Sequence, residues 1–285
     1  MKFGGHIFLW TERWSNDTLY LIDNASDLGL DCLDISIGDD IEFDPARIRK
    51  RAESAGVEIT ISPGNLWPFK ADISHDDPEF RELGMVWHKK WLSKAGEAGV
   101  KAYSGALYAH PGRIELRKPS ADEFKYAAEN LHALAEYASV QGIKLVIEAM
   151  SHFRTHLVNT PRQMVMLAEK ADHDNLKLLL DTYHMVNEIR DYAQGIELMA
   201  GRLWGIHPCE NNRGVPGSGF IPWDEVFSAL IKINFSGYMI FESYNSSVRN
   251  GEFAFSRGMF HNVCSDGNEF VKKGMKFIKE GLGIK

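Results

Sequence analysis

Short apolar runs alternate with longer amphipathic stretches along the whole chain. The run Leu176–Leu180 ends abruptly at Asp181, and three further runs end in the same way at Glu148, His207 and Glu242. Nearly continuous apolar runs of this length are typical of strands that are covered on both faces, as in a parallel sheet. The stretches between the runs carry apolar residues at helical spacing. The pattern therefore predicts a repeated unit of one strand followed by one helix.

Eight such units follow one another, with no linker or low-complexity tract to divide the chain. Strands are expected at about 2–9, 32–37, 57–62, 100–107, 143–148, 176–181, 202–207 and 237–242. Helices are expected at about 16–28, 45–55, 78–98, 120–140, 160–170, 188–200, 223–233 and 266–280. Eight strand-then-helix units with nothing left over favour a closed barrel over an open doubly wound sheet. We predict a single-domain (β/α)8 TIM barrel that spans residues 1–285.

The strand-end residues carry the candidate chemistry. The carboxyl ends of the strands of such a barrel meet at one mouth, so Glu148, Asp181, His207 and Glu242 are expected to converge. Three carboxylates and one imidazole suit a hard or borderline divalent cation such as Mn²⁺, Mg²⁺ or Co²⁺. The alternative is that each acid caps a helix or pairs with a lysine. That alternative does not explain why three acids, Glu148, Asp181 and Glu242, each stand directly after a buried apolar run.

A metal ion between two carboxylates indicates proton transfer next to a carbonyl group. The cation polarises the C=O bond and stabilises the enediolate that forms when the adjacent carbon loses its proton. If one carboxylate removes the proton and a second supplies one from the opposite face, the stereocentre is inverted. A single carboxylate on one face suits isomerisation instead, because the proton then returns to the neighbouring carbon.

Composition and charge narrow the class of protein. The chain has 285 residues, of which 44% are hydrophobic and 25% charged, as in ordinary globular proteins. A net charge of −7 gives no attraction for nucleic acid or anionic membranes. No apolar run approaches the roughly 20 residues that a membrane span needs. No nucleotide-binding glycine motif follows a strand. Three scattered cysteines, Cys32, Cys209 and Cys264, favour a reducing compartment, so a cytoplasmic location is expected.

Several motifs are similar to those of a known family. They are Val146-Ile147-Glu148, Leu180-Asp181-Thr182-Tyr183-His184, the segment 207–213 (HPCENNR), the segment 217–223 (GSGFIPW) and Ile240-Phe241-Glu242-Ser243. In this order the chain resembles the D-tagatose 3-epimerase/D-psicose (allulose) 3-epimerase group of the xylose isomerase-like superfamily. The resemblance covers nearly the whole chain. It implies an isomerase with a divalent metal, most often Mn²⁺, that acts on a ketose.

The resemblance also implies residue roles. The metal ligands would be Glu148, Asp181, His207 and Glu242, and Glu148 and Glu242 would also act as the acid/base pair. His184 and Arg213 would hold the oxygens at the C1 to C3 end of the ketose. Such barrels often associate, so a homodimer or homotetramer is expected.

Arg154 departs from the family pattern. Family members usually carry a glutamate six positions after the first ligand, whereas this chain carries Arg154 six positions after Glu148. The change reverses a charge at the substrate end of the site. We hypothesise that Arg154 and Arg213 together accept a carboxylate, a phosphate or an additional oxo group. The alternative is that Arg154 turns to solvent.

Aromatic residues near the expected mouth are further substrate-contact candidates, because aromatic rings pack against the C–H faces of sugars. They are Trp14, Trp67 and Tyr108, although ordinary barrel packing explains each of them equally well. Our leading interpretation is a metal-dependent ketose 3-epimerase. An aldose-ketose isomerase, or a dehydratase or lyase of the same superfamily, is the alternative enzyme, and a non-catalytic sugar-binding protein is the alternative from another class. A metal-dependent endonuclease would need more histidines and a basic surface.

Overall fold

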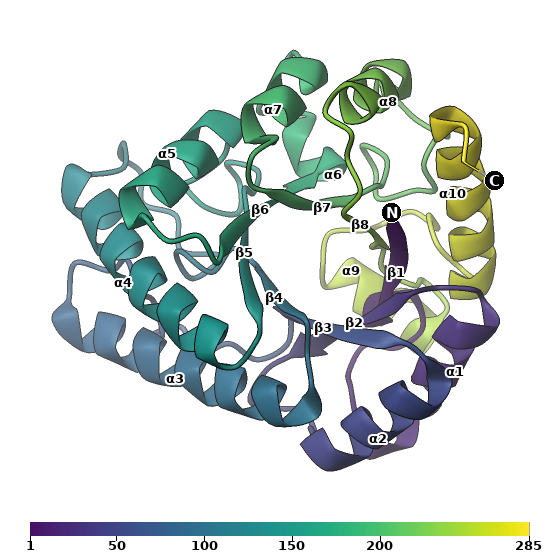
Figure 1. Ribbon diagram of the computed structural model, residues 1–285, viewed down its shortest axis with the longest axis horizontal. Coiled ribbons are helices and arrows are strands. Elements are labelled where there is room, and N and C mark those ends of the chain that lie inside the picture. Colours follow the sequence, from purple (N-terminus) through teal and green to yellow (C-terminus); the bar gives the residue numbers. More distant parts are fainter. Residues whose placement is uncertain (285) are drawn as a thin grey trace.

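The computed structural model describes residues 1–284, and a closed barrel of eight parallel strands in sequential order lies at its centre (Figure 1). The strands are β1 (Lys2–His6), β2 (Cys32–Ile37), β3 (Glu58–Pro63), β4 (Ala102–Gly105), β5 (Lys144–Glu148), β6 (Leu176–Asp181), β7 (Leu203–His207) and β8 (Tyr238–Phe241). Strand β1 pairs with both β2 and β8, which closes the barrel. The predicted (β/α)8 TIM barrel is therefore confirmed. Residue 285, the last of the predicted domain, lies outside the described residues.

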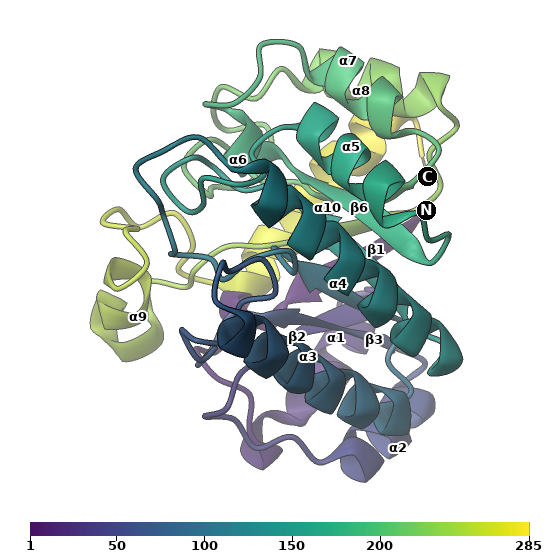
Figure 2. The ribbon, with the colours of Figure 1, turned by 90° about the vertical axis from the view of Figure 1, so that its left-hand side faces the viewer.

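Helices surround the barrel (Figures 1 and 2). They are α1 (Tyr20–Asp27), α2 (Pro45–Ala55), α3 (Pro78–Ala98), α4 (Ala121–Val140), α5 (Pro161–Ala171), α6 (Thr182–Met185), α7 (Tyr192–Met199), α8 (Trp223–Lys232), α9 (Glu252–Phe255) and α10 (Gly267–Leu282), with 3₁₀ turns at Ile7–Leu9, Asn16–Thr18 and Val248–Gly251. Side-chain oxygens cap many of the helix N-termini, as the sequence signals predict. The capping residues include Asp44, Asp77, Ser120, Thr160, Asp191 and Asp266. Among residues 1–284, no helix has the length and apolarity that a membrane crossing requires.

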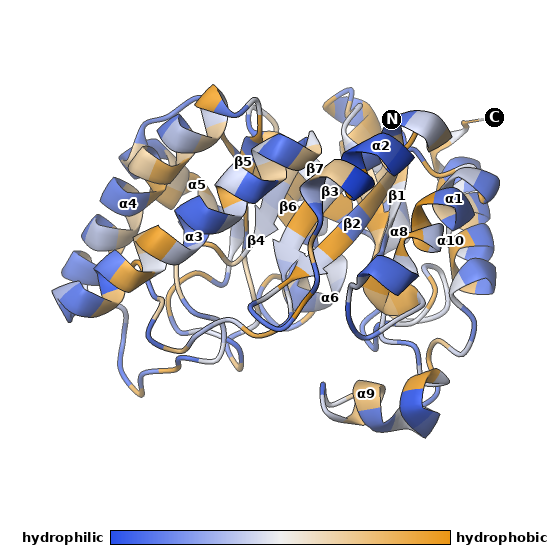
Figure 3. Cartoon of the chain, turned by 90° about the horizontal axis from the view of Figure 1, so that it is seen from below, coloured by the Kyte–Doolittle hydropathy of each residue, from blue (hydrophilic) through white to orange (hydrophobic). Residues whose placement is uncertain are grey.

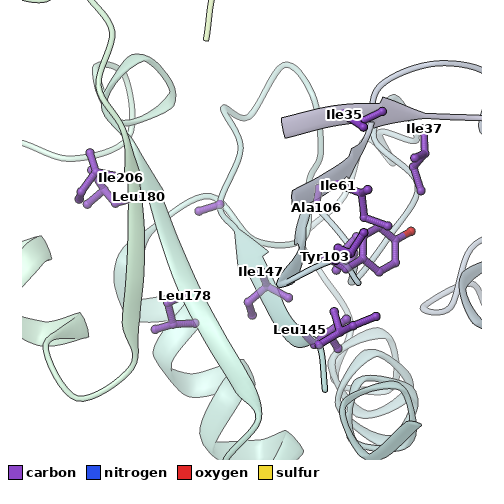
Figure 4. Close-up of a cluster of buried hydrophobic side chains, with 14 of the residues drawn as sticks. Ile35, Ile37, Ile61, Tyr103, Ala106, Leu145, Ile147, Leu178, Leu180 and Ile206 are labelled. Atoms are coloured by element: carbon purple, nitrogen blue, oxygen red, sulfur yellow. The ribbon is translucent and has the colours of Figure 1, made fainter. Parts of the chain in front are cut away.

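The main hydrophobic core lies between the barrel and its helices. Figure 4 shows apolar side chains that several strands contribute to this layer, among them Leu145 and Ile147 of β5. Successive side chains of a strand point to opposite faces. Val146 and Glu148 therefore face the barrel interior. The same alternation places Leu179 and Asp181 of β6 on the inner face.

The barrel interior is filled below the strand ends. Ala102, Val146 and Leu179 form a small apolar cluster that is separate from the main core, and Trp204 packs against it. The Trp204 ring stacks on Tyr238 with ring centroids 4.3 Å apart. The Tyr238 hydroxyl donates to Glu58 at 2.8 Å, and the Lys2 ammonium donates to the same carboxylate at 2.6 Å. These residues sit at the starts of β1, β3 and β8, so the end of the barrel opposite the strand-end acids is packed.

Four segments differ from the predicted elements. Strand β1 ends at His6 rather than near Leu9, because a 3₁₀ turn follows it. A one-turn helix, α6, directly follows Asp181, whose side chain caps it. The helix expected from 188 begins later, at Tyr192, because Asp191 caps it. Helix α9 was not predicted, and Figure 3 shows it beyond the loop-bearing end of the barrel, apart from the ring of helices.

Candidate active site

Four side chains converge at the carboxyl ends of adjacent strands. Glu148 ends β5, Asp181 ends β6, His207 ends β7 and Glu242 directly follows β8. One ligand atom from each lies within 4.8 Å of the others. His207 Nδ1 is 3.1 Å from Glu148 Oε1, 3.2 Å from Glu242 Oε2 and 3.8 Å from Asp181 Oδ2. The structure thus brings together the whole ligand set expected from the sequence.

The donor set fits a divalent cation. Glu148, Asp181 and His207 are buried and Glu242 is nearly so, which places three carboxylates together away from water. Like charges this close repel one another unless a cation or protons offset them. Oxygen donors with a single imidazole suit Mn²⁺, Mg²⁺ or Co²⁺ rather than a structural zinc ion, which favours cysteines. The four residues can therefore hold a divalent metal ion.

The carboxylates of the cluster have unequal pKa values. Burial raises the pKa of Glu148 to about 7. Burial acts in the same direction on Asp181 and Glu242, but the Arg213 guanidinium outweighs it and holds both pKa values well below their usual range. Burial alone would lower the pKa of His207, yet the charge of Glu148 and hydrogen bonds to the carboxylates raise it well above its ordinary value. In the metal-free protein, the His207 imidazole is therefore the favoured site for a proton beside the carboxylates.

The stability of the metal-free protein is expected to fall as the pH rises above the ordinary histidine pKa of about 6.5 and towards the raised pKa of His207. His207 has a raised pKa in the folded state, so the stability that its protonation contributes is lost as the pH rises through that pKa. Glu148 adds a fall in stability at lower pH, between its ordinary pKa of 4.5 and its raised pKa of about 7. Buried neutral histidines such as His184 give the opposite trend, but only below the ordinary histidine pKa of about 6.5.

Urea unfolding of chelator-treated protein at several pH values measures this trend. The His207→Gln variant is expected to show a flatter dependence. Saturating Mn²⁺ is expected to reverse the slope, because the ligands bind metal in their deprotonated forms. A metal-free protein that gains stability over this window would contradict the assignment of the protons.

Arg213 belongs to the cluster. Its Nη1 atom lies 2.6 Å from Asp181 Oδ2 and 3.2 Å from Glu242 Oε2, and its guanidinium stacks 4.3 Å from the Tyr183 ring centroid. The backbone of Arg213 has φ of 65°, a left-handed conformation that costs energy for a non-glycine residue. The Ser243 hydroxyl donates to its carbonyl oxygen at 2.7 Å and helps to hold this conformation. Arg213 is thus fixed between two predicted metal ligands.

The loop that carries Arg213 is organised by a buried acid, Glu210. Its carboxylate accepts hydrogen bonds from Trp223 Nε1 at 2.6 Å, from the backbone of Gly217 at 2.7 Å and from the backbone of Ile221 at 3.2 Å. One side chain therefore holds together the ends of the Gly- and Asn-rich segment after β7. Glu210 belongs to the motif at 207–213, but the sequence alone predicted no role for it.

His184 also reaches the cluster. Helix α6 places its Nε2 atom 3.9 Å from Asp181 Oδ2 and 3.2 Å from Arg213 Nη2. On the other side of the ring, Nδ1 accepts from the Ser151 backbone N–H at 3.3 Å and lies 2.8 Å from the Ser151 hydroxyl, so Ser151 fixes the orientation of the imidazole. Burial lowers the pKa of His184 to about 4, which agrees with a neutral ring. His184 therefore presents a fixed neutral imidazole beside the candidate metal centre.

A cavity of about 150 Å³ opens above the cluster. Glu148, His207 and Glu242 line it, as do His184, Arg213, Arg154 and Trp67 from the expected substrate-binding set. Trp14 and Tyr108 do not line it. Trp14 is buried, and the Tyr108 hydroxyl donates to the Val158 carbonyl at 2.9 Å, so these two rings pack within the protein rather than face the cavity.

His6 lines the same cavity and had no defined direction in the sequence. Its Nδ1 atom accepts from the backbone of Phe8 at 3.1 Å, so Nε2 carries the proton, 3.5 Å from Asp34. The hydroxyls of Thr60 and Ser62 donate to the Asp34 carboxylate at 2.6 and 2.5 Å. Burial lowers the pKa of His6, which keeps it neutral. Its place as the last residue of β1, paired with Asp34, was the signal that could have located it.

The closed barrel and the carboxylate-rich centre at its mouth define a class of TIM-barrel protein with a candidate divalent-metal site. The comparison with known families agrees: residues 22–280 match the family described as the xylose isomerase-like TIM barrel. The chain belongs to this family.

Three relatives show where in the family the chain lies. D-psicose 3-epimerase of Agrobacterium fabrum is 30% identical over 250 residues, which cover 86% of this chain and 85% of that protein. L-ribulose 3-epimerase of Mesorhizobium japonicum is 28% identical over 284 residues, which cover 99% and 94%. A solved structure of L-ribulose 3-epimerase superposes with a TM-score of 0.90 at 29% identity, covering 99% of this chain and 94% of that one. These similarities confirm the resemblance to ketose 3-epimerases that the motifs indicated.

Proposed function

We propose that this protein is a metal-dependent ketose 3-epimerase. The observation that carries the proposal is that two carboxylates from different strands, Glu148 and Glu242, both line the cavity beside the candidate metal centre. Two acid/base groups allow removal of a proton from C3 on one face and its return on the other. The relatives named as D-psicose and L-ribulose 3-epimerases support the reaction class.

Different residues of the site would bind the metal, transfer the proton and hold the substrate. A bound divalent cation, which we propose is Mn²⁺, would polarise the ketone and make the neighbouring C–H group more acidic. Glu148 and Glu242 hold and transfer the proton at C3. Arg213, fixed by Asp181, presents guanidinium donors to substrate oxygens, and His184, fixed by Ser151, presents a ring nitrogen at the same end of the cavity. The surrounding protein excludes water from most of the cluster.

The size of the cavity supports a single sugar unit as substrate. Its volume of about 150 Å³ lies below the range of roughly 300–1,000 Å³ that is common for larger ligands. A monosaccharide ketose is therefore proposed. A homodimeric or homotetrameric assembly and a cytoplasmic location stay predictions from the sequence.

Incubation of the Mn²⁺-loaded protein in D₂O with D-tagatose, D-psicose, D-fructose and L-ribulose tests the proposal. Proton NMR is expected to show deuterium at C3 together with the C3 epimer. Deuterium without epimer, accompanied by an aldose or a dehydrated product, would favour the isomerase or lyase alternative. If none of these sugars and none of their anionic derivatives exchanges deuterium, the proposed epimerase reaction is wrong.

A further inference from the structure

Arg154 lines the cavity with a guanidinium that has no acidic partner among residues 1–284. Its backbone is held on both sides, because its N–H donates to the Ser151 carbonyl and its carbonyl accepts from Gly112, both at 2.8 Å. No hydrogen bond or ion pair to its side chain is present within the described part of the chain, although Arg154 lines the cavity together with Tyr183. Arg154 is also exposed, so it lies where the cavity meets solvent.

Arg257 approaches the same cavity from the segment after β8. Its guanidinium lies 4.1 Å from the Phe253 ring centroid and 4.7 Å from that of Phe8, so aromatic faces hold it in place. Its hydrogen-bond partners are neutral: the Gly64 carbonyl at 3.5 Å, and the Phe253 carbonyl and Ser256 hydroxyl at 3.4 and 3.2 Å. Across residues 1–284, no carboxylate lies within ion-pair distance of it.

Arg154 and Arg257 lack the carboxylate partners that Arg213 has. The Arg213 charge is offset by Asp181 and Glu242 at 2.6 and 3.2 Å. The three negative charges of the cluster would balance the single charge of Arg213 and the two charges of a divalent cation. Arg154 and Arg257 therefore add positive charge to the cavity without a carboxylate at ion-pair distance within residues 1–284, although Glu12 and Glu242 act on Arg257 from farther away. Their charges also act on each other, since Arg154, after burial, contributes to lowering the pKa of Arg257.

We infer that the natural substrate is an anionic keto sugar whose terminal carboxylate or phosphate is bound by Arg154 and Arg257. Guanidinium groups bind these two anions with paired, charge-assisted hydrogen bonds. This inference rests on the proposed function, because it names the substrate class of the same site. It also replaces the pair expected from the sequence, since Arg257 and not the already paired Arg213 acts with Arg154.

The burial of the side chains orients the substrate. The acid/base residues lie at the buried end of the cavity, whereas Arg154 is exposed and Arg257 is half-buried. The reacting ketone end would therefore lie deep and the anionic end at the mouth. For a six-carbon ketose this places the charge on C6, away from C3.

Three ligands that differ only at C6 test the inference: D-fructose, D-fructose with C6 oxidised to a carboxylate, and D-fructose 6-phosphate. We expect at least one of the two anions to show a kcat/KM for deuterium exchange at C3 that is about tenfold or more above that of D-fructose. A preference for the carboxylate identifies a sugar acid, and a preference for the phosphate identifies a sugar phosphate. Arg154→Gln and Arg257→Gln are each expected to lower the ratio of anionic to neutral kcat/KM by about tenfold or more.

Two further variants control for charge and fold. Arg190→Ala removes one positive charge from an exposed residue that does not line this cavity, and it should leave the ratio unchanged. Arg154→Glu, which restores the family residue, should shift the preference towards D-fructose. A wild-type preference for D-fructose, with ratios unaltered in both Gln variants, would overturn the inference and leave the epimerase proposal intact.

Equilibrium binding separates a failure of the inference from a failure of the proposed function. If none of the three ligands exchanges deuterium, the epimerase proposal fails, and calorimetry then decides on the anion site. Tighter binding of either anion than of D-fructose, lost in Arg154→Gln, supports the site. Equal binding of all three ligands overturns it.

Discussion

Replacing Glu148 by Gln is expected to lower the rate of deuterium exchange at C3 by at least about 10²–10⁴-fold, while the barrel remains folded. The amide has nearly the same shape as the carboxylate but cannot take up or release the proton. Folding should be little affected, because the buried carboxyl has its pKa raised to about 7 and is already partly protonated in the metal-free protein. NMR of the reaction in D₂O measures the loss, and circular dichroism checks the fold.

A control variant and a metal assay show whether the loss of exchange is specific to the proton-transfer role of Glu148. Glu225→Gln changes an exposed acid of α8 outside the cavity and should leave the exchange rate unchanged. Glu242→Gln should reduce exchange to a similar extent as Glu148→Gln. The metal content of each variant shows whether the loss reflects proton transfer or ligation. Exchange at the wild-type rate in both Gln variants of the cluster would remove the acid/base assignment.

Removing the metal by chelation is expected to abolish exchange and to lower the melting temperature by roughly 5–10 °C. A ligand that binds only the folded state stabilises it by about 2.7 kcal/mol at a hundredfold excess over Kd. For a chain of this size each kcal/mol corresponds to roughly 2–4 °C. Differential scanning calorimetry with and without EDTA, followed by addition of Mn²⁺, Co²⁺ or Mg²⁺, measures the effect and ranks the metals.

The Asp181→Asn variant tests whether this stabilisation arises at the cluster. Asp181 is buried and contacts Arg213 at 2.6 Å, so its amide variant loses a ligand charge but keeps the side-chain volume. Its melting temperature should respond far less to EDTA. A response as large as that of the wild type would place the bound metal elsewhere in the protein.

The buried strands and the four strand-end ligands were predictable from the sequence, because both follow from local patterns. An apolar run that ends in an acid marks the end of a strand, and the barrel topology brings such ends together whatever their separation in sequence. The positions of Glu148 and Asp181 at the barrel mouth could therefore be predicted without knowing how the side chains pack. The same reasoning located His184 near the centre, although the helical turn of α6 that orients it was not predicted.

The remaining site residues depend on three-dimensional packing that has no local sequence signal. Arg257 lies in an aperiodic segment, and it reaches the cavity only because Phe8 and Phe253 hold its guanidinium. Glu210 organises its loop through partners up to thirteen positions away. Trp14 and Tyr108 were placed at the mouth by their position in the chain, but an aromatic ring near a strand end packs equally well within the protein. Residue type alone does not distinguish these two outcomes.

The packed end of the barrel opposite the strand-end acids limits where a ligand can enter the site. The Trp204–Tyr238 stack and the Lys2–Glu58 contact close the end of the barrel opposite the candidate metal centre. Under the proposed function, substrate and product would therefore both pass through the mouth of the cavity above the cluster. That mouth is framed by the segments that carry Arg154 and Arg257. If Arg154 and Arg257 bind the anionic end of the substrate as inferred above, they would also hold the product back, so tighter binding at the mouth would slow turnover.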